Sequence, residues 1–452
     1  MPLFSRFRDH SVFAHSAFDR PAFDSPDPAP ARFAVAQGDA SPVLHQGLLW
    51  KAFVPDAPKL IVSRMQDHVV ETSDGHLHTL VNLHRGRGLT LLSSDDDGRT
   101  WDVTARIPNT RGSSSDIRLV EGEDRLLVVT TTKAGKVLYG TYDYDLADGG
   151  WTRDIASEVT HAGIDNTTTN PTVAMDAEGT IAVAYNVEGD DGLGLVFAWS
   201  EDGGATWEKA ETDFPGVAAG SFRVLSTPDG FAVLAATAEA MTFLTYDPGT
   251  DTWSGETVNE TGAVGRYASH FSTTTIGDDI YAASVDASET LSVMRYEGAT
   301  GAWSEPETPA PITGKTTNVQ LSAGSDGSLH LVYDDHDHPG RLVVLESEDG
   351  GETWSEEAVL QVPRWLRLEP TLLQFDDLPL VRFEAPEQFD DELLVEVQVN
   401  IPGRDGWTSL YTFVLDTEAD AVHLAAHDLP AHNLSAHNLS AHNLSADDLA
   451  AL

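Results

Sequence analysis

The sequence predicts an all-β protein, a seven-bladed β-propeller of four-stranded antiparallel blades with extended tails at both ends. The first observation is a short turn that occurs three times, as SDDDGRTW at 94–101, SEDGGATW at 200–207 and SEDGGETW at 347–354. The second is a series of tryptophans spaced by 46 to 56 residues: Trp101, Trp151, Trp207, Trp253, Trp303, Trp354 and Trp407. A repeat near 50 residues fits one propeller blade of four short strands.

Four β-rich runs fill each repeat. Around Trp354 they read TNVQLSAG, SLHLVYD, RLVVLES and TWSEEAVL, and before Trp207 they read NPTVAMD, TIAVAYN, LVFAWS and TWEKAE. Turn-forming residues separate most of these runs. Seven such groups extend from about residue 59 to residue 417. With strands A to D counted outward from the axis, we expect the repeated turn between strands C and D of every blade.

One tryptophan stands outside this series. Trp50, in LLWKAFV, lies 51 residues before Trp101, which is the register of a D strand. Because the seven groups already have their own D strands, the sequence leaves open whether Trp50 belongs to an extra strand or to a strand that closes the ring.

Each position of the repeated turn has a mechanical role. The Asp can accept hydrogen bonds from N–H groups of the turn, the Gly permits a positive φ, and the Trp buries a large apolar area between blades. The pattern S-x-D-x-G-x-T-W resembles the Asp box of bacterial neuraminidase (BNR) repeats. In families with this box it lies on the face away from the active site, so the resemblance implies a structural role. The positions are Ser94, Asp96, Gly98, Trp101, Ser200, Asp202, Gly204, Trp207, Ser347, Asp349, Gly351 and Trp354.

Two enzyme families resemble parts of the chain. Sialidases are six-bladed Asp-box propellers whose first substrate-binding arginine lies in an Arg-Ile-Pro motif upstream of the first box. Here Arg106-Ile107-Pro108 follows the first box. Because the blade count is also seven, we do not carry the sialidase site over.

Seven-bladed BNR-repeat polysaccharide lyases are the second resemblance. The segments DGHLHTLVNLH (74–84) and DGSLHLVYDDH (326–336) align, which pairs His78 with His330 and His84 with His336. Such lyases need a base and a neutralising Arg or metal near a uronate carboxylate, a role that His84 would fill with Arg85 and Arg87. We favour the alternative that His78 and His330 are satisfied inside a blade, because polar residues in strands are usually structural. No catalytic residue is assigned.

The predicted topology places a candidate ligand face opposite the Asp boxes, where the B–C and D–A connections lie. In a chain poor in cations, these connections are rich in Arg, and Arg with Tyr and Trp suits sugars and carboxylates. Polar loops without a ligand are the plain alternative. The candidate positions are His84, Arg85, Arg87, Arg111, Arg266, Tyr267, His270, Asp335, His336, Arg364, Trp365 and Arg367.

The loop DDHDH at 334–338 is the one weak candidate for a metal site, through Asp334, His336 and His338. Carboxylates and imidazoles are suitable ligands for a divalent cation. Neighbouring side chains alternate in direction, however, so one more acidic loop is the preferred interpretation. The sequence points to no other cofactor.

The composition restricts the partners. The net charge is −45, from 72 acidic and 27 basic residues, six of them lysine. An acidic surface that prefers Arg to Lys predicts a protein adapted to high salt, where self-repulsion is screened. The charge argues against nucleic acid as a partner. No apolar run predicts membrane insertion, no secretory signal is expected, and the absence of Cys excludes disulfides.

The two ends differ from the propeller. Residues 1–34 are a neutral Phe- and Pro-rich segment that we expect to be a docking arm, and 35–58 are an N-terminal extension or closure strand. The propeller is expected over 59–417. Residues 418–452 form a tail of pentads such as AHNLS, where Asn433, Asn438 and Asn443 head glycosylation sequons.

These features lead to one functional hypothesis and one alternative. We expect a non-catalytic glycan-binding or structural propeller on the virion surface or tail of a halophilic virus. It is anchored through residues 1–34 and the C-terminal tail to other virion proteins, as a homo-oligomer within an assembly, and contacts host glycan. The alternative is a glycoside hydrolase or polysaccharide lyase that acts on acidic polysaccharide. The expected location is a virion or extracellular surface, with the cytoplasm as alternative.

Overall fold

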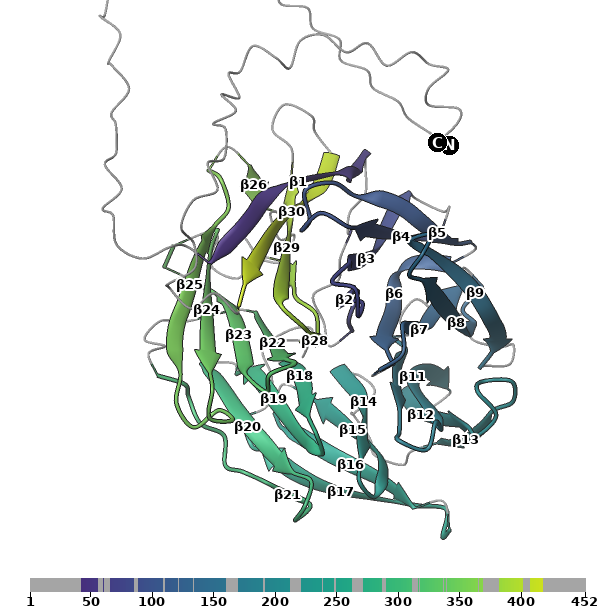
Figure 1. Cartoon of the computed structure of the whole chain (residues 1–452). Helices are drawn as coiled ribbons and strands as arrows, with labels where there is room; N and C mark the ends of the chain where they lie inside the picture. Colours follow the sequence, from purple (N-terminus) through teal and green to yellow (C-terminus); the bar gives the residue numbers. More distant parts are fainter. Residues whose placement is uncertain are drawn as a thin grey trace, which may run out of the picture. The chain divides into compact units, whose positions relative to one another are not determined.

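The computed structural model describes residues 42–417 except for short segments, the longest of which are 160–169, 212–220, 262–270, 369–381 and 401–406. Seven β-sheets stand around a central axis (Figure 1). This arrangement confirms the predicted all-β seven-bladed propeller. The described residues include no helix that is long and apolar enough to cross a membrane. The predicted arm at 1–34 and the tail at 418–452 lie outside the described residues.

The first four blades each use four consecutive antiparallel strands, from the axis outward. Blade 1 contains β2 (Val69–Glu71), β3 (Leu77–His84), β4 (Gly88–Ser94) and β5 (Asp102–Ile107). Blade 2 contains β6 (Thr110–Leu119), β7 (Arg125–Thr132), β8 (Val137–Asp145) and β9 (Gly150–Glu158). Blade 3 contains β10 (Thr172–Met175), β11 (Ile181–Gly189), β12 (Gly192–Ser200) and β13 (Glu208–Glu211). Blade 4 contains β14 (Ser221–Thr227), β15 (Gly230–Ala236), β16 (Met241–Asp247) and β17 (Thr252–Asn259).

The remaining blades depart from this pattern in the seventh. Blade 5 contains β18 (Phe271–Ile276), β19 (Asp279–Val285), β20 (Leu291–Glu297) and the short β21 (Ala302–Trp303). Blade 6 contains β22 (Val319–Gly324), β23 (Leu329–Asp334), β24 (Arg341–Ser347) and β25 (Ser355–Gln361), and β28 (Gln388–Phe389) pairs in parallel with β22. Blade 7 combines β26 (Arg367–Leu368) and β27 (Phe383–Glu384) with β29 (Glu392–Asn400), β30 (Trp407–Asp416) and β1 (Val43–Pro55).

The N-terminal strand closes the ring. Strand β1 pairs antiparallel with β30 and is the outermost strand of blade 7, so the closure alternative holds for the segment around Trp50. The expectation that the turn before Trp407 joins strands C and D is wrong, because Trp407 begins the third strand of blade 7. The D strand of this blade comes instead from the other end of the propeller sequence. Trp50 therefore occupies the D-strand position that the tryptophan series assigned to Trp407.

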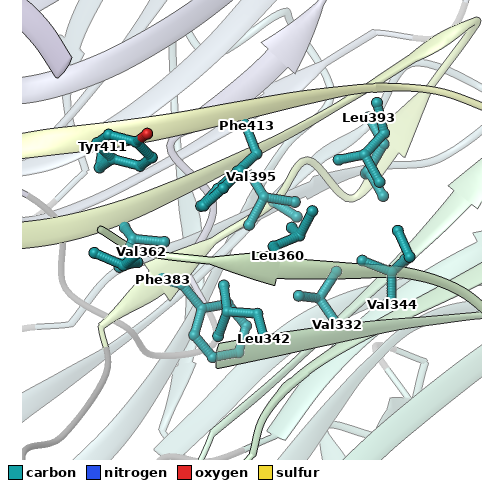
Figure 2. Packing of buried hydrophobic residues seen from close by; sticks show 14 of the residues in the cluster. Val332, Leu342, Val344, Leu360, Val362, Phe383, Leu393, Val395, Tyr411 and Phe413 are labelled. Atoms are coloured by element: carbon teal, nitrogen blue, oxygen red, sulfur yellow. The ribbon is translucent and has the colours of Figure 1, made fainter. Parts of the chain in front are cut away.

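Apolar cores lie between adjacent blades. Figure 2 shows the core between blades 6 and 7, where Leu342 and Leu360 face Val395 and Phe413. Six further clusters of the same kind fill the other interfaces. Because each sheet is apolar on both faces, its inner strands are almost wholly buried, as the burial of β22 illustrates.

The three Asp boxes are compact hydrogen-bonded turns. In the third, Asp349 accepts hydrogen bonds from the Thr353 N–H at 2.8 Å and from its hydroxyl at 2.5 Å, and Ser347 Oγ accepts from Gly351 N at 2.9 Å. Asp96 and Asp202 bind Thr100 and Thr206 in the same way. The predicted shape-giving role of the box is therefore visible in its contacts. These turns share one face of the propeller, the Asp-box face, with the A–B turns; the B–C and D–A connections lie on the opposite face, the loop face.

Candidate functional site

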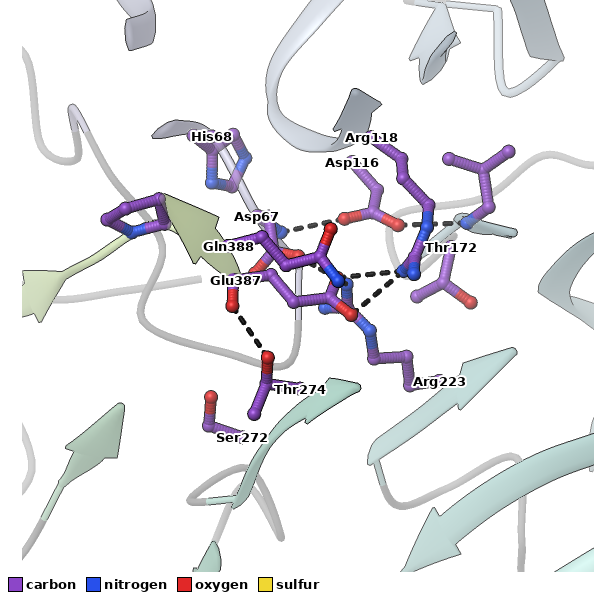
Figure 3. A network of polar contacts seen from close by, with 12 residues as sticks. Asp67, His68, Asp116, Arg118, Thr172, Arg223, Ser272, Thr274, Glu387 and Gln388 are labelled. Carbon is purple, nitrogen blue, oxygen red and sulfur yellow. Dashed lines mark hydrogen bonds and ion pairs between the residues drawn. The ribbon is translucent and has the colours of Figure 1, made fainter. Parts of the chain in front are cut away.

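A buried cluster of charged side chains lies at the propeller axis, and we call it the axial network (Figure 3). At its centre the Arg223 guanidinium, on β14, is only 1% exposed. It forms ion pairs with Asp67, which precedes β2, and with Glu387 at 2.6 Å. Arg118 on β6 donates to both carboxylate oxygens of Glu387 at 2.8 and 3.0 Å. The network thus joins blades 1, 2 and 4 to the chain segment that follows β27.

A second carboxylate ties the inner strands of the first three blades together. Asp116 is fully buried on β6. One of its oxygens accepts from the Asp67 N–H at 2.7 Å and the other from the Val173 N–H at 2.8 Å. Thr172 continues the pattern, because its hydroxyl accepts from the N–H of Val224 in blade 4 at 3.1 Å. Side chains of inner strands therefore satisfy backbone donors of neighbouring blades.

The segment around Glu387 crosses the axis and reaches blades 5 and 6. Its main-chain oxygen accepts from the Thr274 hydroxyl at 2.6 Å and from the Ala323 N–H at 2.9 Å. The Ser322 hydroxyl donates to the neighbouring Pro386 oxygen at 2.6 Å. With Glu384 on β27, all seven blades contact this cluster or a residue bonded to it. The axial network is therefore a device that holds the ring of blades together.

Burial and pairing set the protonation of these groups in opposite directions. Burial raises the pKa of Asp67 well above its usual range, against the attraction of Arg223. Burial also works to raise the pKa of Glu387, but the two guanidinium groups of Arg118 and Arg223 outweigh it and keep that pKa below its usual value. The carboxylates around Arg223 raise its pKa, so it stays charged. Glu387 is thus the ionised partner that both arginines share.

A chain of hydroxyl, imidazole and carboxylate runs beside this cluster. His68 Nε2 is 3.2 Å from Ser115 Oγ, and its Nδ1 is 2.9 Å from Glu384 Oε1. All three side chains are buried. Burial opposes protonation of His68, but the nearby Glu384 carboxylate outweighs it and raises the pKa to about 9. A protonated imidazole cannot take a proton from a hydroxyl, so at neutral pH this chain is an ion pair and not an activated serine.

A second buried carboxyl lies opposite Glu384. Glu396 on β29 is its cross-strand partner in the register of β27 with β29. It is fully buried and accepts from the Thr79 hydroxyl at 2.9 Å. Burial and the charge of Glu384 raise the pKa of Glu396 to about 8, so at neutral pH it carries its proton.

An axial pocket of about 440 Å³ opens below the network on the Asp-box face. Its wall combines the ends of β2, β6, β18 and β22 with their A–B turns and with Gln388–Asp390. The carboxylates of Glu71, Asp124 and Asp390 give the wall a negative character, and Arg118 is its one cation among the described residues. Burial and the charges of Asp390 and Asp391 raise the pKa of Glu71 to about 7.

Most of the predicted ligand positions fall where the structure gives no side-chain description. Arg85, Arg87, Arg266, Tyr267, His270, His336 and Trp365 lie outside the described residues. For His84, Arg111 and Arg367 only the backbone is described, in β3, β6 and β26. Arg364 is exposed, and Asp335 accepts from His338 Nδ1 at 2.9 Å. Their gathering on the loop face stays a prediction.

The weak metal site is described in part. Asp334 is buried, and one of its oxygens accepts from the Thr316 hydroxyl at 2.8 Å and from the Asn318 N–H at 2.7 Å. His338 is exposed, and His336 lies outside the described residues. Within the part of the chain that the structure describes, no group of three or more potential metal ligands gathers.

The two aligned histidines of the lyase resemblance are locked inside blades. Both His78 and His330 are fully buried. His78 accepts from the Trp151 indole N–H at 3.1 Å through Nδ1, which leaves Nε2 to donate to Thr72 Oγ1 at 2.9 Å. Burial lowers the pKa of His78 to about 3. His330 contacts Ser328 at 2.9 Å and Glu357 at 2.8 Å. The preferred structural interpretation of both residues agrees with these contacts.

Arg106 of the Arg-Ile-Pro segment lies on β5, the outermost strand of blade 1, with an exposed side chain. An arginine on the outer strand is separated from the axis by three strands, which supports the decision not to assign it a sialidase role.

The sequence analysis missed the axial network. Arg223 in SFRVL and Glu384 and Glu387 in FEAPE are charged residues next to apolar inner-strand positions. A buried charge in such a run needs a partner, and this was the available signal. The partners are 156 and 164 residues from Arg223 in the sequence, so no local pattern identifies them.

Comparisons with known proteins give three structural neighbours and one family. A lectin from Aleuria aurantia in complex with a fucosyl disaccharide is 12% identical over 71% of this chain and 99% of its own, with a TM-score of 0.42. An ulvan lyase is 11% identical over 82% of this chain and 96% of its own, with a TM-score of 0.45. A Trypanosoma rangeli sialidase is 14% identical over 82% of this chain and 58% of its own, with a TM-score of 0.43.

Comparison with curated protein sequences gave no match. The family described as the BNR repeat-like domain matches residues 141–371, just over half of the chain. This match covers two of the three Asp boxes and agrees with the resemblance that their sequence predicts. The chain belongs to the BNR repeat-like domain family.

Proposed function

We propose that this protein is a non-catalytic glycan-binding propeller. In this proposal it is displayed on the surface or tail of a halophilic virus, is anchored by residues 1–34 and contacts host surface glycan through its loop face. The C-terminal tail and contacts between copies contribute to the assembly.

The observation that carries the non-catalytic part is the mutual pairing of the axial charges. Enzymes that act on acidic sugars need cations and carboxyl groups that are free to meet substrate. Here Arg223 and Arg118 bind Glu387, and Glu384 binds the protonated His68. Each of these groups also ties one blade to another. Their chemistry is therefore used within the fold.

Two features support a glycan as ligand. The BNR repeats resemble those of neuraminidases, which are sugar-binding proteins. The B–C and D–A connections carry arginines and aromatic residues in a chain with few cations. Guanidinium groups bind hydroxyls and carboxylates in a bidentate manner, and aromatic faces stack on sugar rings.

The halophilic and virion parts rest on the sequence. The net charge of −45 suits a surface that stays hydrated in concentrated salt. The neutral, Phe-rich residues 1–34 suit an anchor in another chain. If the salt adaptation is real, the melting temperature falls when molar salt is removed. Fractionation of the source particles with an antibody to this chain tests the location: recovery in the soluble fraction alone contradicts a virion role.

One observation favours the enzyme alternative. The axial pocket contains Glu71, whose pKa is raised to about 7, beside the carboxylate of Asp390. A protonated and an ionised carboxyl group are what glycoside hydrolysis requires. If the protein is a hydrolase or lyase, this pocket is the first place to look, and Glu71→Gln abolishes turnover.

The deciding experiment measures binding and turnover together. Purified protein in molar salt is applied to a panel of immobilised oligosaccharides that contain neutral hexoses, fucose, sialic acid and uronates. The same sugars are followed in solution for new reducing ends and for the ultraviolet absorbance of unsaturated uronates. We expect saturable binding and no product. Product formation supports the enzyme, and the absence of binding contradicts the proposal.

A further inference from the structure

A second pocket lies between blades 1 and 2, towards the loop face, and we call it the interblade pocket. Its volume is about 260 Å³. It is lined by the end of β5 and by strands β7, β8 and β9 of blade 2. It shares no lining residue with the axial pocket.

The strand register of blade 2 explains why a hollow exists here. Residues directly opposite one another in antiparallel strands project on the same face of the sheet. Gly140 on β8 lies opposite Val128 on β7 and Ala156 on β9, so this row across the sheet carries small side chains. The rows on either side carry larger ones, with Leu138 and Tyr142 on β8. The hollow is the space between these two larger side chains.

Blade 1 supplies the opposite wall in a fixed position. This wall is Ile107 and Pro108, at the end of β5. The Thr110 hydroxyl donates to the Ile107 oxygen at 3.2 Å and accepts from the Leu89 N–H at 2.8 Å. Gly88 has a φ of 98°, and a Cβ there would be 2.1 Å from the Ile107 oxygen. The wall is therefore held close to β4 by contacts that a larger residue would break.

Polar groups stand at the two ends of the hollow. At one end Arg153 lies opposite Tyr142 and hydrogen-bonds its hydroxyl. At the other end Glu158 lies opposite Leu138, and its carboxylate is 2.6 Å from Lys136 Nζ. Arg153 and Glu158 are both exposed, so each keeps hydrogen-bonding capacity for a ligand. The pocket thus offers an apolar floor with a donor at one end and an acceptor at the other.

We propose that the interblade pocket binds one pyranose ring of a glycan. A pyranose has apolar C–H faces and a rim of hydroxyls, which matches the apolar floor and the polar ends. The volume is below the range of about 300–1,000 Å³ of pockets for drug-sized ligands, so it suits a single ring. This inference rests on the proposed glycan-binding function and assigns it a subsite.

The test fills the pocket and compares two matched controls. Ala156→Trp places a large ring in the hollow, whereas Thr152→Trp places the same ring on an exposed position of β9 that does not line the pocket. Arg153→Ala removes the donor, and Arg106→Ala removes an exposed arginine of β5 outside the pocket. Circular dichroism and melting curves verify that each variant is folded.

Binding is measured for all variants on the immobilised oligosaccharide panel and by saturation-transfer NMR with methyl pyranosides. We expect a loss of at least about tenfold in affinity for Ala156→Trp and for Arg153→Ala, with both controls unchanged. If the wild-type protein binds a sugar and Ala156→Trp binds it equally well, the subsite is wrong and the glycan-binding function stands. If the wild-type protein binds no sugar in either measurement, the proposed function fails and the subsite fails with it.

Discussion

Arg223 of blade 4 and Glu387, which follows the inner strand of blade 7, meet at the propeller axis with 2.6 Å between nitrogen and oxygen. The two residues are 164 positions apart in the sequence. Both side chains are buried, and Arg118 from blade 2 shares the same carboxylate. This contact therefore links blades that have no strand pairing with one another.

Replacing Arg223 tests the structural role of the axial network. Arg223→Met leaves Asp67 and Glu387 buried without their cation, and loss of one partner of a buried pair costs about 3–5 kcal/mol. We expect this loss in the free energy of unfolding, measured by denaturant titration in molar salt. Arg295→Ala is the matched control, because Arg295 pairs with Asp279 while 41% exposed, and exposed pairs contribute about 0–1 kcal/mol. Equal effects in the two variants would show that the axial pairing adds no stability.

The pH dependence of stability tests the protonation of Glu396. Its pKa is about 8 in the folded protein and about 4.3 in an unfolded chain, so the folded state binds more protons between these values. Stability therefore falls as the pH rises through this window. His68 adds a loss in the same direction, because its pKa is raised to about 9 and its ion pair with Glu384 disappears as the pH approaches that value.

Glu396→Gln removes the first of these losses and keeps a hydrogen-bond acceptor for Thr79. Unfolding free energies from pH 5 to pH 8 should have a flatter slope in this variant than in the wild-type protein. Glu352→Gln, at an exposed position, serves as the control and should follow the wild-type slope. A Glu396→Gln slope that equals the wild-type slope would mean that Glu396 is already ionised in the folded protein.

Two glycines of positive φ separate backbone strain from packing. Gly204 in the second Asp box has a φ of 94°, and a Cβ there would lie 2.2 Å from Tyr139 Cε1. Gly179 has a φ of 84° and open space where its Cβ would stand. Gly179→Ala should cost about 1 kcal/mol from strain alone, whereas Gly204→Ala should cost about 2–4 kcal/mol because Tyr139 must move. Thermal melts of both variants provide the comparison, and similar losses would contradict the packing argument.

Truncation separates the arm from the closure strand. Removing residues 1–34 should leave a folded, soluble propeller that no longer assembles with its partner. Removing residues 1–55 also removes β1, which covers the edge of β30 and supplies Leu49 to the core between blades 7 and 1. We expect the longer truncation to unfold or aggregate. Circular dichroism and co-sedimentation decide, and a misfolded 1–34 truncation would mean that the arm belongs to the propeller.

The sequence predicts the blades well because each blade is a local repeat. The run SLHLVYD corresponds to β23 and RLVVLES to β24, with the Asp box directly after, since period, turn residues and β-propensity all agree there. The ring closure differs because it joins the two ends of the propeller. The spacing of Trp50 fits a D strand, but only the pairing of β1 with β30 shows which blade receives it.

The axial network shows the limit of local patterns. Asp67, Asp116 and Arg223 each occur as one polar residue in or beside an inner strand, which is also how an ordinary structural residue looks. Their meaning comes from a geometry that places all inner strands around one axis. The charged loop residues of the candidate ligand face are easy to find in a sequence for the opposite reason, since they stand out in composition, but composition does not show whether they converge.

The most direct test of the central claim is a binding and turnover measurement on one preparation of the full chain in molar salt. Isothermal titration with the best sugar of the oligosaccharide panel gives the binding curve, and the same mixture is followed for new reducing ends and unsaturated uronates. The account predicts saturable binding with the sugar recovered unchanged, because the axial cations and carboxylates are bound to one another. Sugar converted in excess of the protein present, or no binding at all, would contradict it.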